Sequence, residues 1–358
     1  MKKRVFSFFC LFLIASSALA GNTPVKPEGS GSAADPYLIK KIENLVWLSE
    51  NTDKVKGQHF LLTADIDAAE TKDWNEGYGF LPIGCKIEQG ELAEHPFTGI
   101  FEGNGHAIMN LFINNPALEY AGLFGTISSV RHKTFPKKFT FRSRISNLIL
   151  YNINISGGSN VGALAGRATG CEVANIYAIG NLQAKNQLGG LFSICSGAII
   201  SNCYVQVDFQ NRDCSVGGFF FSAHEDSRIS SCCVAGSCLF PKASKRKYYY
   251  PSIFGMGSGD YCASNCLVAL KLKGSQKYNN IVPLPPTNQL CSCYCSAEDL
   301  NVKRDALKFL MSNEALQRKT TYVNWNFKKT WSIEEYKDRP RLRSIDAMFS
   351  KFLERRTR

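Results

Sequence analysis

The sequence predicts an all-β protein built as a right-handed parallel β-helix, a solenoid with short α-helical caps at its N- and C-terminal ends. Two short phrases recur in register beyond residue 100, and Gly, of which the 358-residue chain has 29, punctuates every repeat unit. Short β-branched and aromatic runs separated by Gly and Asn are typical of strands and turns, not of helical repeats such as TPR or ankyrin. The period of about 28 residues therefore predicts stacked coils in one elongated domain.

The first phrase combines an apolar residue, two small or polar residues and a second apolar residue. Its copies, at steps of 28, 27, 29 and 34 residues, are Ile145-Ser-Asn-Leu148, Val173-Ala-Asn-Ile176, Ile200-Ser-Asn-Cys203, Ile229-Ser-Ser-Cys232 and Ala263-Ser-Asn-Cys266. Equivalent positions of successive coils lie above one another, so the amides should form a ladder at a turn. The ladder residues are Asn147, Asn175, Asn202 and Asn265, with Ser231 as the imperfect member. The last residue of each copy should face the interior, where Cys behaves as a small apolar side chain.

The second phrase is rich in Gly and lies between the copies of the first. Its copies are Ala121-Gly-Leu-Phe-Gly125, Val161-Gly-Ala-Leu-Ala-Gly166, Leu188-Gly-Gly-Leu-Phe192, Val216-Gly-Gly-Phe-Phe220 and, more loosely, Ser252-Ile-Phe-Gly-Met256. These Gly residues are expected to allow tight bends or a close approach of neighbouring coils.

The N-terminal region predicts export. A basic start, an apolar run and the Ala18-x-Ala20 sequence indicate a signal peptide over residues 1–20, and residues 21–35 form a flexible leader. The apolar run is too short to span a bilayer, and no transmembrane segment is expected in the mature chain. Residues 36–67 are assigned to the N-terminal cap, with a short amphipathic helix from Ile39 to Leu48 and a strand from His59 to Asp67.

The pattern changes after residue 290. Ser296-Ala-Glu-Asp299 predicts the start of a helix through Met311, and the residues from Thr321 to Ile333 predict terminal strands. Residues 296–345 are therefore assigned to a C-terminal cap, since a solenoid needs its open ends covered. Residues 346–358 form a basic tail in which apolar residues share one helical face.

Two strongly basic segments interrupt the repeat. Residues 131–144 carry six Lys/Arg and no acid, and residues 241–251 carry four Lys/Arg and three Tyr. Surface loops on a rigid solenoid are the usual place for binding, and cations beside planar rings suit anionic ligands. Anionic glycans or host and cell-surface components are the expected partners and nucleic acid is not, while a solvated loop is the plain alternative. The candidate binding residues are Lys133, Lys137, Lys138, Lys245, Arg246, Lys247, Tyr248, Tyr249 and Tyr250.

The recurring phrases resemble the GLUG-motif repeats of bacterial exported and surface proteins. The resemblance spans about residues 29–345, including Gly122-Leu-Phe-Gly125 and the closing residues from Trp325 to Ile333. It implies a β-helix in a secreted or cell-surface protein, and it leaves the activity open because the motif occurs in adhesin-like and protease-associated proteins.

No catalytic constellation is recognisable, and no catalytic residue, cofactor or metal site is expected. His224-Glu225 lacks the second His of a zinc-protease helix, and neither a G-x-S-x-G elbow nor a phosphate-binding loop occurs. Asp65, Asp67 and Asp73 lack the later ligands of a calcium loop, which favours strand-end capping.

The 14 Cys of the chain become 13 when the signal peptide is removed. Cys291-x-Cys293-x-Cys295 would share one face of a strand, which favours disulfides to Cys262, Cys266 or Cys238, or buried thiols, over a metal site. Stacking also places Cys232 and Cys266 within disulfide reach.

The leading functional hypothesis is a non-catalytic secreted or surface module for adhesion or interaction. A carbohydrate-active β-helix enzyme, such as a polysaccharide lyase or hydrolase, is the first alternative, and an architectural spacer is the second. Carboxylates that converge with Lys or Arg in one groove would favour the enzyme.

Overall fold

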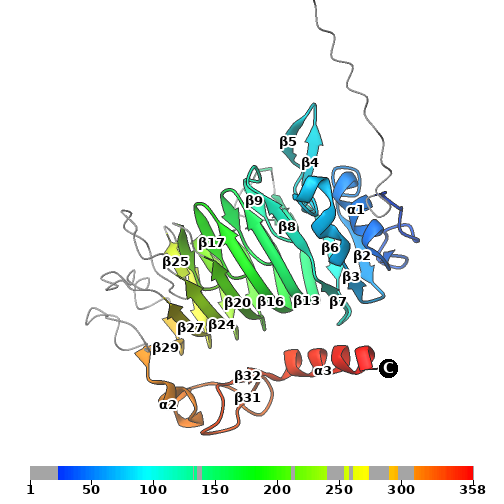
Figure 1. Cartoon of the computed structure of the whole chain (residues 1–358). Helices are drawn as coiled ribbons and strands as arrows, with labels where there is room; N and C mark the ends of the chain where they lie inside the picture. Colours follow the sequence, from blue (N-terminus) through cyan, green and yellow to red (C-terminus); the bar gives the residue numbers. More distant parts are fainter. Residues whose placement is uncertain are drawn as a thin grey trace, which may run out of the picture.

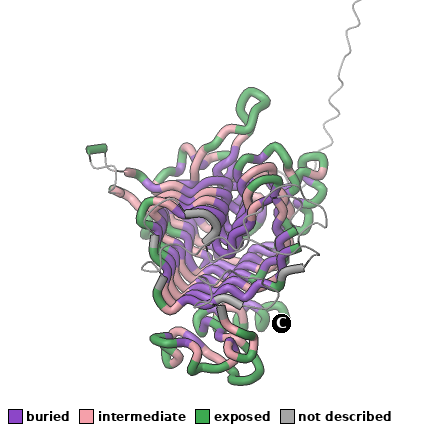
Figure 2. The backbone as a smooth tube through the Cα atoms, turned by 90° about the vertical axis from the view of Figure 1, so that its left-hand side faces the viewer, coloured by how far each residue is buried: buried purple, intermediate pink, exposed green. Residues whose placement is uncertain are grey.

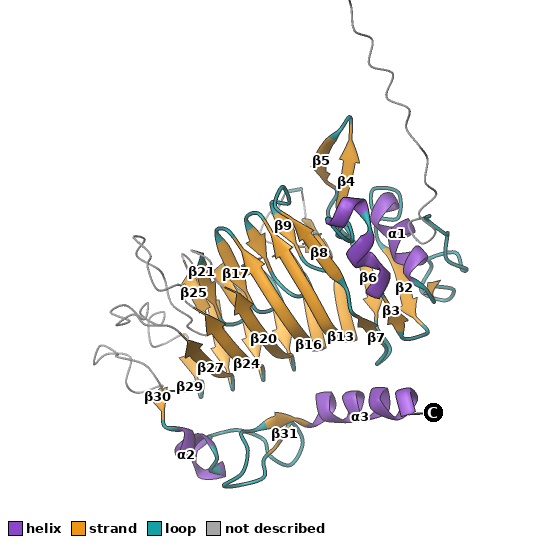
Figure 3. Cartoon of the chain, viewed as in Figure 1, coloured by secondary structure: helices purple, strands orange, loops and turns teal. Residues whose placement is uncertain are grey.

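The computed structural model describes residues 23–131, 133–134, 139–210, 214–239, 254–257, 261–273, 290–296 and 310–357. Strands of three parallel sheets form the body of the described chain and extend along the long axis of the molecule (Figures 1 and 3). The predicted signal peptide, 1–20, lies outside the described residues, as does the whole of the second basic segment, 241–251.

The largest of the three parallel sheets carries the candidate functional site on its outward-facing side. Its 17 described strands are β1 (Tyr37–Ile39), β2 (Gln58–Leu62), β3 (Ile66–Asp67), β6 (Gly99–Glu102), β7 (Ala107–Met109), β8 (Phe112–Asn115), β13 (Arg144–Gly157), β16 (Glu172–Ala184), β19 (Ile199–Ser201), β20 (Tyr204–Gln210), β23 (Ser227–Ser230), β24 (Cys233–Leu239), β26 (Tyr261–Ser264), β27 (Leu267–Lys273), β28 (Leu290–Cys291), β29 (Tyr294–Ser296) and β30 (Leu310–Met311).

Two smaller parallel sheets complete the stack. The first consists of β10 (Phe124–Ser128), β15 (Ala165–Thr169), β18 (Phe192–Ser196), β22 (Phe220–His224) and β25 (Phe254–Gly257). The second consists of β9 (Tyr120–Ala121), β14 (Asn160–Val161), β17 (Gln187–Gly189) and β21 (Ser215–Gly217).

The remaining elements lie outside these sheets. Three antiparallel pairs are β4 (Cys85–Glu88) with β5 (Glu91–Glu94), β11 (Val130–Arg131) with β12 (Phe139–Phe141), and β31 (Trp331–Ser332) with β32 (Arg341–Leu342). The described helices are α1 (Ile42–Asn51), α2 (Asn313–Leu316) and α3 (Arg343–Thr357), with 3₁₀ turns η1 (Ala69–Asp73), η2 (Asn75–Gly77) and η5 (Lys319–Thr321).

The chain visits the three sheets in a fixed order. Strands β13, β14 and β15 lie in the large, four-stranded and five-stranded sheets, and β16, β17 and β18 repeat that order. Each strand pairs in parallel with its equivalent one repeat later, as Ile145 does with Val173 and Val161 with Leu188. The sequence period is thus the number of residues between strands that pair with each other. The predicted all-β class with parallel strands is confirmed.

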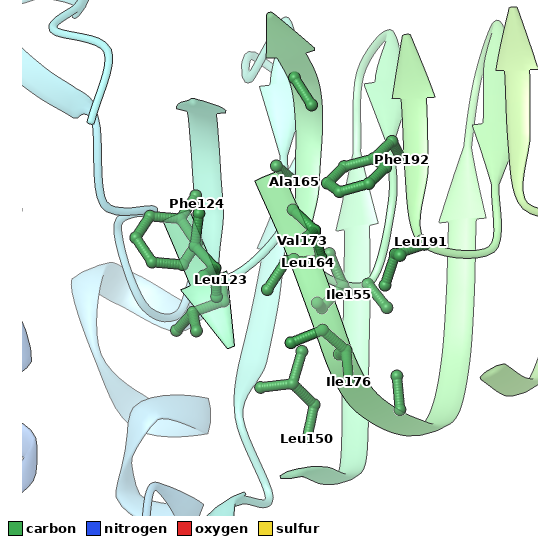
Figure 4. Close-up of a cluster of buried hydrophobic side chains, with 14 of the residues drawn as sticks. Leu123, Phe124, Leu150, Ile155, Leu164, Ala165, Val173, Ile176, Leu191 and Phe192 are labelled. Carbon is green, nitrogen blue, oxygen red and sulfur yellow. The ribbon is translucent and has the colours of Figure 1, made fainter. Parts of the chain in front are cut away.

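The interior between the sheets is filled by apolar side chains from every repeat. Leu150, Ile176 and Leu191 are fully buried within this cluster, and Phe124 and Phe192 lie at the five-stranded sheet (Figure 4). Viewed from the end of the stack, buried residues line the inside and exposed residues the turns (Figure 2). Burial of this continuous apolar surface is the main stabilising contribution to the fold.

Residues 36–67 combine sheet and covering helix. Tyr37 pairs with Phe60, and Phe60 pairs with Phe101, so β1 and β2 continue the large sheet. Helix α1 lies between them in sequence and buries Leu45 and Leu48. The helix expected at Ile39–Leu48 is therefore found three residues later, and the strand expected at His59–Asp67 is split into β2 and β3.

The C-terminal residues differ from the expected end cap. Of the helix expected from Ser296 to Met311, residues 297–309 lie outside the described chain, and Leu310–Met311 is strand β30. From there the chain passes beneath the large sheet and back toward the first repeats, where α3 lies alongside it (Figures 1 and 3). We call residues 310–357 the strap. The expected terminal strands at 321–333 reduce to β31, in which Trp331 pairs with Leu342 of β32. The Trp331 ring also stacks on Trp325, at 4.1 Å between ring centroids.

Candidate functional site: the groove beneath the strap

An outward-facing row of the large sheet is covered by the strap. Register pairing joins one residue from each of seven successive strands, and all seven belong to a second apolar cluster outside the main core. These residues are Ala107, Ile149, Tyr177, Tyr204, Cys233, Leu267 and Tyr294. We call this set the outer row.

The strap packs on both ends of the outer row. At the last repeats the indole N–H of Trp325 donates to the carbonyl of Ser292 at 2.8 Å, and the Trp325 ring meets Tyr294 at 5.9 Å. At the earlier repeats Phe349 of α3 lies 4.7 Å from Tyr177. The apolar face expected in the basic tail is the face that α3 turns toward the sheet, with Phe352 fully buried.

An ion-pair clasp holds the end of the strap against the first repeats. Arg355 donates from Nε and Nη2 to the two carboxylate oxygens of Asp65, each at 2.9 Å, and Nη2 also reaches the carbonyl of Gly105 at 2.8 Å. Asp65 also accepts from the backbone N–H of Ala107 at 2.9 Å and lies 3.1 Å from His106 Nδ1. Burial raises the pKa of Asp65, but the hydrogen bonds from Arg355, Ala107 and His106 outweigh burial and lower it overall.

The clasp should make the strap sensitive to acid. The pKa of Asp65 is lower in the folded protein than in the unfolded chain, where it is about 3.9. The ionised carboxylate therefore stabilises the fold fully above the unfolded pKa, and this stabilisation is lost as pH falls through the folded pKa. We expect Asp65→Asn to lower the stability of strap attachment by about 1 kcal/mol at neutral pH. Amide hydrogen exchange of α3, measured across pH, checks this; equal acid sensitivity in the variant would contradict it.

A groove of about 800 Å³ lies between the strap and the middle of the outer row. Its floor includes Tyr204 and the small residues Cys233, Ala235 and Ala269, and residues 337–341 and α3 form the opposite side. The floor is hollow because small side chains follow larger ones in register: Cys233 follows Tyr204, and Ala235 and Ala269 follow Gln206. Burial raises the pKa of Cys233 to about 12, so this floor residue remains a neutral thiol.

The charged groups around the groove are of both signs. Arg341 Nε lies 3.7 Å from an Asp338 carboxylate oxygen and 3.8 Å from one of Asp346. Asp208 accepts from both the backbone N–H and the hydroxyl of Ser237, at 2.9 and 2.7 Å. Lys271 is exposed and, within the described part of the chain, has neither an ion-pair nor a hydrogen-bond partner.

The first basic segment is partly docked on the repeats. Arg131 pairs with Glu225, Arg144 pairs with Glu172 at 3.1 Å, and Arg142 donates to the carbonyl of Gly170 at 2.7 Å. The hydrogen bonds from Arg131 and Ser196 lower the pKa of Glu225. Three of the six cations thus hold the β11–β12 hairpin against the repeats. The segment is therefore not the loop projecting wholly into solvent that the sequence predicted.

Only one of the predicted binding residues falls in the described chain. Lys133 is exposed beside the hairpin. The structure does not describe Lys137, Lys138, Lys245, Arg246, Lys247, Tyr248, Tyr249 and Tyr250. Among the predicted binding residues that the structure describes, Lys133 does not line the groove.

The predicted ladder residues lie at the same turn of successive repeats. Asn147, Asn175, Asn202 and Asn265 all have left-handed backbone conformations, with φ between 52° and 55°. Asn175 Nδ2 donates to Asn147 Oδ1 at 2.9 Å, and Asn147 Nδ2 donates to Glu102 Oε1 at 2.9 Å. Because Asn adopts this conformation more readily than most residues, the turn explains its recurrence.

The later cysteines follow this turn. Cys203, Cys232, Cys266 and Cys293 are buried in one interior column, and the Sγ of each donates to the carbonyl of the residue two positions earlier. Cys232 and Cys266 are not joined by the proposed disulfide. Cys291 is exposed and Cys293 buried, since Ser292 at φ 50° turns the chain, so the two do not share a face as expected.

Asp65, Asp67 and Asp73 do not converge on a cation. Asp65 belongs to the clasp, and Asp67 accepts from the Ala69 N–H at 3.0 Å and from Asn110 at 2.8 Å. Within the described residues, no group of three or more His, Cys, Asp or Glu side chains could hold a metal ion. No helix of the described chain is long and apolar enough to cross a membrane.

Comparison with known proteins supports the fold and gives two partial relatives. No family model matches the chain. Halomucin of Haloquadratum walsbyi is 30% identical over 165 residues, 46% of this chain, and a "Putative Gly-rich membrane protein" of Evansella cellulosilytica is 33% identical over 121 residues, 33% of this chain. The chain spans only 2% and 13% of the length of these relatives.

A solved structure from Bacteroides ovatus, described as a "putative immunoglobulin A1 protease", has a TM-score of 0.59 at 18% identity. The match covers 88% of this chain and 95% of that one. It shows a shared fold over most of the molecule, and at this identity it shows the fold alone.

The groove is the feature that sequence reasoning missed. Its floor residues are spread over three repeats, and its other side comes from the strap. The alternation of Tyr204, Gln206 and Asp208 along one strand was the available signal, because alternate residues share a sheet face. Nothing in the spacing of residues 337–346 indicated that they would lie opposite that strand.

Proposed function

We propose that the chain is an exported right-handed parallel β-helix of the GLUG-motif type, acting at the cell surface or outside the cell as a non-catalytic module for adhesion or interaction. The repeated visit to three parallel sheets supports the β-helix, and the sequence phrases support the motif. One relative is named halomucin and the other "Putative Gly-rich membrane protein", which supports a surface location.

The arrangement of the groove carboxylates favours binding over catalysis. Asp338 and Asp346 flank the same guanidinium of Arg341, and Asp208 accepts two hydrogen bonds from Ser237. A glycoside hydrolase needs two carboxyl groups that flank the scissile bond, whereas these three carboxylates are already engaged by Arg341 and Ser237. The groove is thus suited to hold a ligand by ion pairs and hydrogen bonds.

A carbohydrate-active enzyme is the second candidate. It is favoured by one observation, namely that carboxylates and cations do converge in a single groove with Tyr204. Release of reducing ends from acidic polysaccharides by the wild-type chain, lost in Asp338→Asn or Asp346→Asn, would replace the binding proposal with the enzyme.

The basic segments supply a direct test of the interaction role. We expect the mature chain to bind anionic polymers with an affinity that falls as the NaCl concentration rises, because exposed charges are screened by salt. The triple variant Lys245→Ala, Arg246→Ala, Lys247→Ala should bind about tenfold more weakly, the loss that removal of about 1.4 kcal/mol produces. A glycan and matrix-protein array, followed by titration in increasing salt, measures both effects.

A matched control separates the effect of the basic loop on binding from the effect of net charge. Lys185, Lys328 and Lys329 are exposed elsewhere on the molecule, and changing these three to Ala removes the same charge. Equal weakening in the two triple variants, or binding that does not respond to salt, would count against the basic loop as the contact.

A further inference from the structure

We propose that the groove beneath the strap is the binding site for a short stretch of a carboxylated glycan, a hydroxyl-rich chain whose sugar rings carry occasional carboxylate groups. The inference rests on the proposed interaction function and names the ligand class and its site. A volume of about 800 Å³ lies in the range of pockets that enclose small ligands, and it leaves room for a di- or trisaccharide.

One strand presents three kinds of contact in line. Tyr204, Gln206 and Asp208 are alternate residues of β20 and all three line the groove. At the rise of a strand they extend over about 13 Å, the scale of two or three linked sugar rings. An aromatic ring packs against the C–H face of a pyranose, while an amide and a carboxylate accept and exchange hydrogen bonds with its hydroxyls.

A second line of polar groups crosses the strands. Asp208 pairs in register with Ser237, and Ser237 pairs with Lys271. A carboxylate, a hydroxyl and an ammonium group therefore follow one another across three neighbouring strands, about 10 Å from end to end. Sugar hydroxyls suit the first two groups, and the third is placed to bind a carboxylate.

The distribution of charge selects a sparsely charged polymer. Lys271 is exposed and has no partner within the described residues, so it is available to an incoming anion. Asp208, Asp338 and Asp346 line the same groove beside Lys337, Arg339 and Arg341, so the two signs nearly balance there and a chain with a negative charge on every unit, such as a nucleic acid, is a poorer match. A neutral glycan would leave the Lys271 cation unused, whereas a chain with intermittent carboxylates matches both signs.

The test uses the full mature chain and an array of uronic-acid oligosaccharides, including oligogalacturonate and hyaluronan fragments, beside neutral oligosaccharides of equal length. We expect binding to at least one acidic probe and weaker or no binding to its neutral counterpart. Lys271→Ala should weaken that binding about tenfold, as expected for loss of one charged hydrogen bond. Lys185→Ala, which removes an exposed charge outside the groove, should leave it unchanged.

A filled groove provides the second measurement. Ala235→Trp places a large ring on the floor and should abolish binding, whereas Ala174→Trp, on the same sheet but outside the groove, should not. Circular dichroism melts confirm that each variant is folded. If a folded Ala235→Trp chain still binds the acidic probe, or if neutral and acidic probes bind equally, the groove assignment is overturned.

These outcomes separate the inference from the proposed function. Acidic-polymer binding that survives Ala235→Trp but is lost in the Lys245, Arg246 and Lys247 variant would move the site to the basic loop and keep the interaction role. A wild-type chain that binds no polymer or matrix protein would overturn both.

Discussion

Replacement of Trp331 by alanine is expected to release the strap. Trp331 is fully buried in the outer apolar cluster, and its ring stacks on Trp325, which in turn hydrogen bonds to the last described repeat. Loss of a buried aromatic side chain removes its transfer free energy and leaves a cavity, a combined cost of about 3–5 kcal/mol. Because the outer cluster is separate from the main core, the substitution should weaken the attachment of the strap before it destabilises the repeats.

Limited proteolysis measures the effect directly. The strap carries many Lys and Arg residues, and trypsin should cut it far faster in Trp331→Ala than in the wild type. Phe327→Ala is the matched control, since Phe327 belongs to the same aromatic group but is only partly buried, 6.4 Å from Trp325. Equal protection of the strap in both variants would show that Trp331 does not anchor it.

The repeating part of the fold could be predicted because each copy carries its own local cause. The Asn at each turn adopts a left-handed conformation, and the residue after it points inward in every copy. The structure adds one copy that was not recognised, Leu290-Cys-Ser-Cys293, which pairs with Ala263 and Ser264 of the preceding repeat. It was missed because Ser292 replaces Asn and the neighbouring Cys suggested metal or disulfide chemistry.

The strap and its groove depend on contacts that sequence spacing does not contain. Arg355 and Asp65 are separated by 290 residues, and their pairing follows only from the path of the chain beneath the sheet. Helix α3 itself was predictable, since Ile345 and Phe352 mark its apolar face, but the surface that receives this face was not. The outer row gave no periodic signal because Cys233 and Leu267 interrupt its tyrosines.

Substitution of Gly189 by alanine is expected to damage the stack itself. Gly189 ends β17 within the Leu188-Gly-Gly-Leu-Phe192 phrase, and a Cβ there would lie 1.7 Å from the carbonyl oxygen of Phe192 and 2.8 Å from the Cα of Phe220. Both atoms belong to backbone, so neither can move without shifting its own strand. Overpacking of this kind costs about 3 kcal/mol, and the cost should spread because each repeat is stabilised by its neighbours.

Gly90→Ala separates this steric cost from the cost of backbone conformation. Gly90 has φ of 86° in the turn between β4 and β5, and a Cβ there would meet no atom within 4 Å, so alanine should cost about 1–2 kcal/mol for the left-handed conformation alone. Urea unfolding followed by circular dichroism compares the two. A Gly189→Ala midpoint no lower than that of Gly90→Ala would mean that the Gly phrase does not serve close approach of the repeats, and that its recurrence needs another cause.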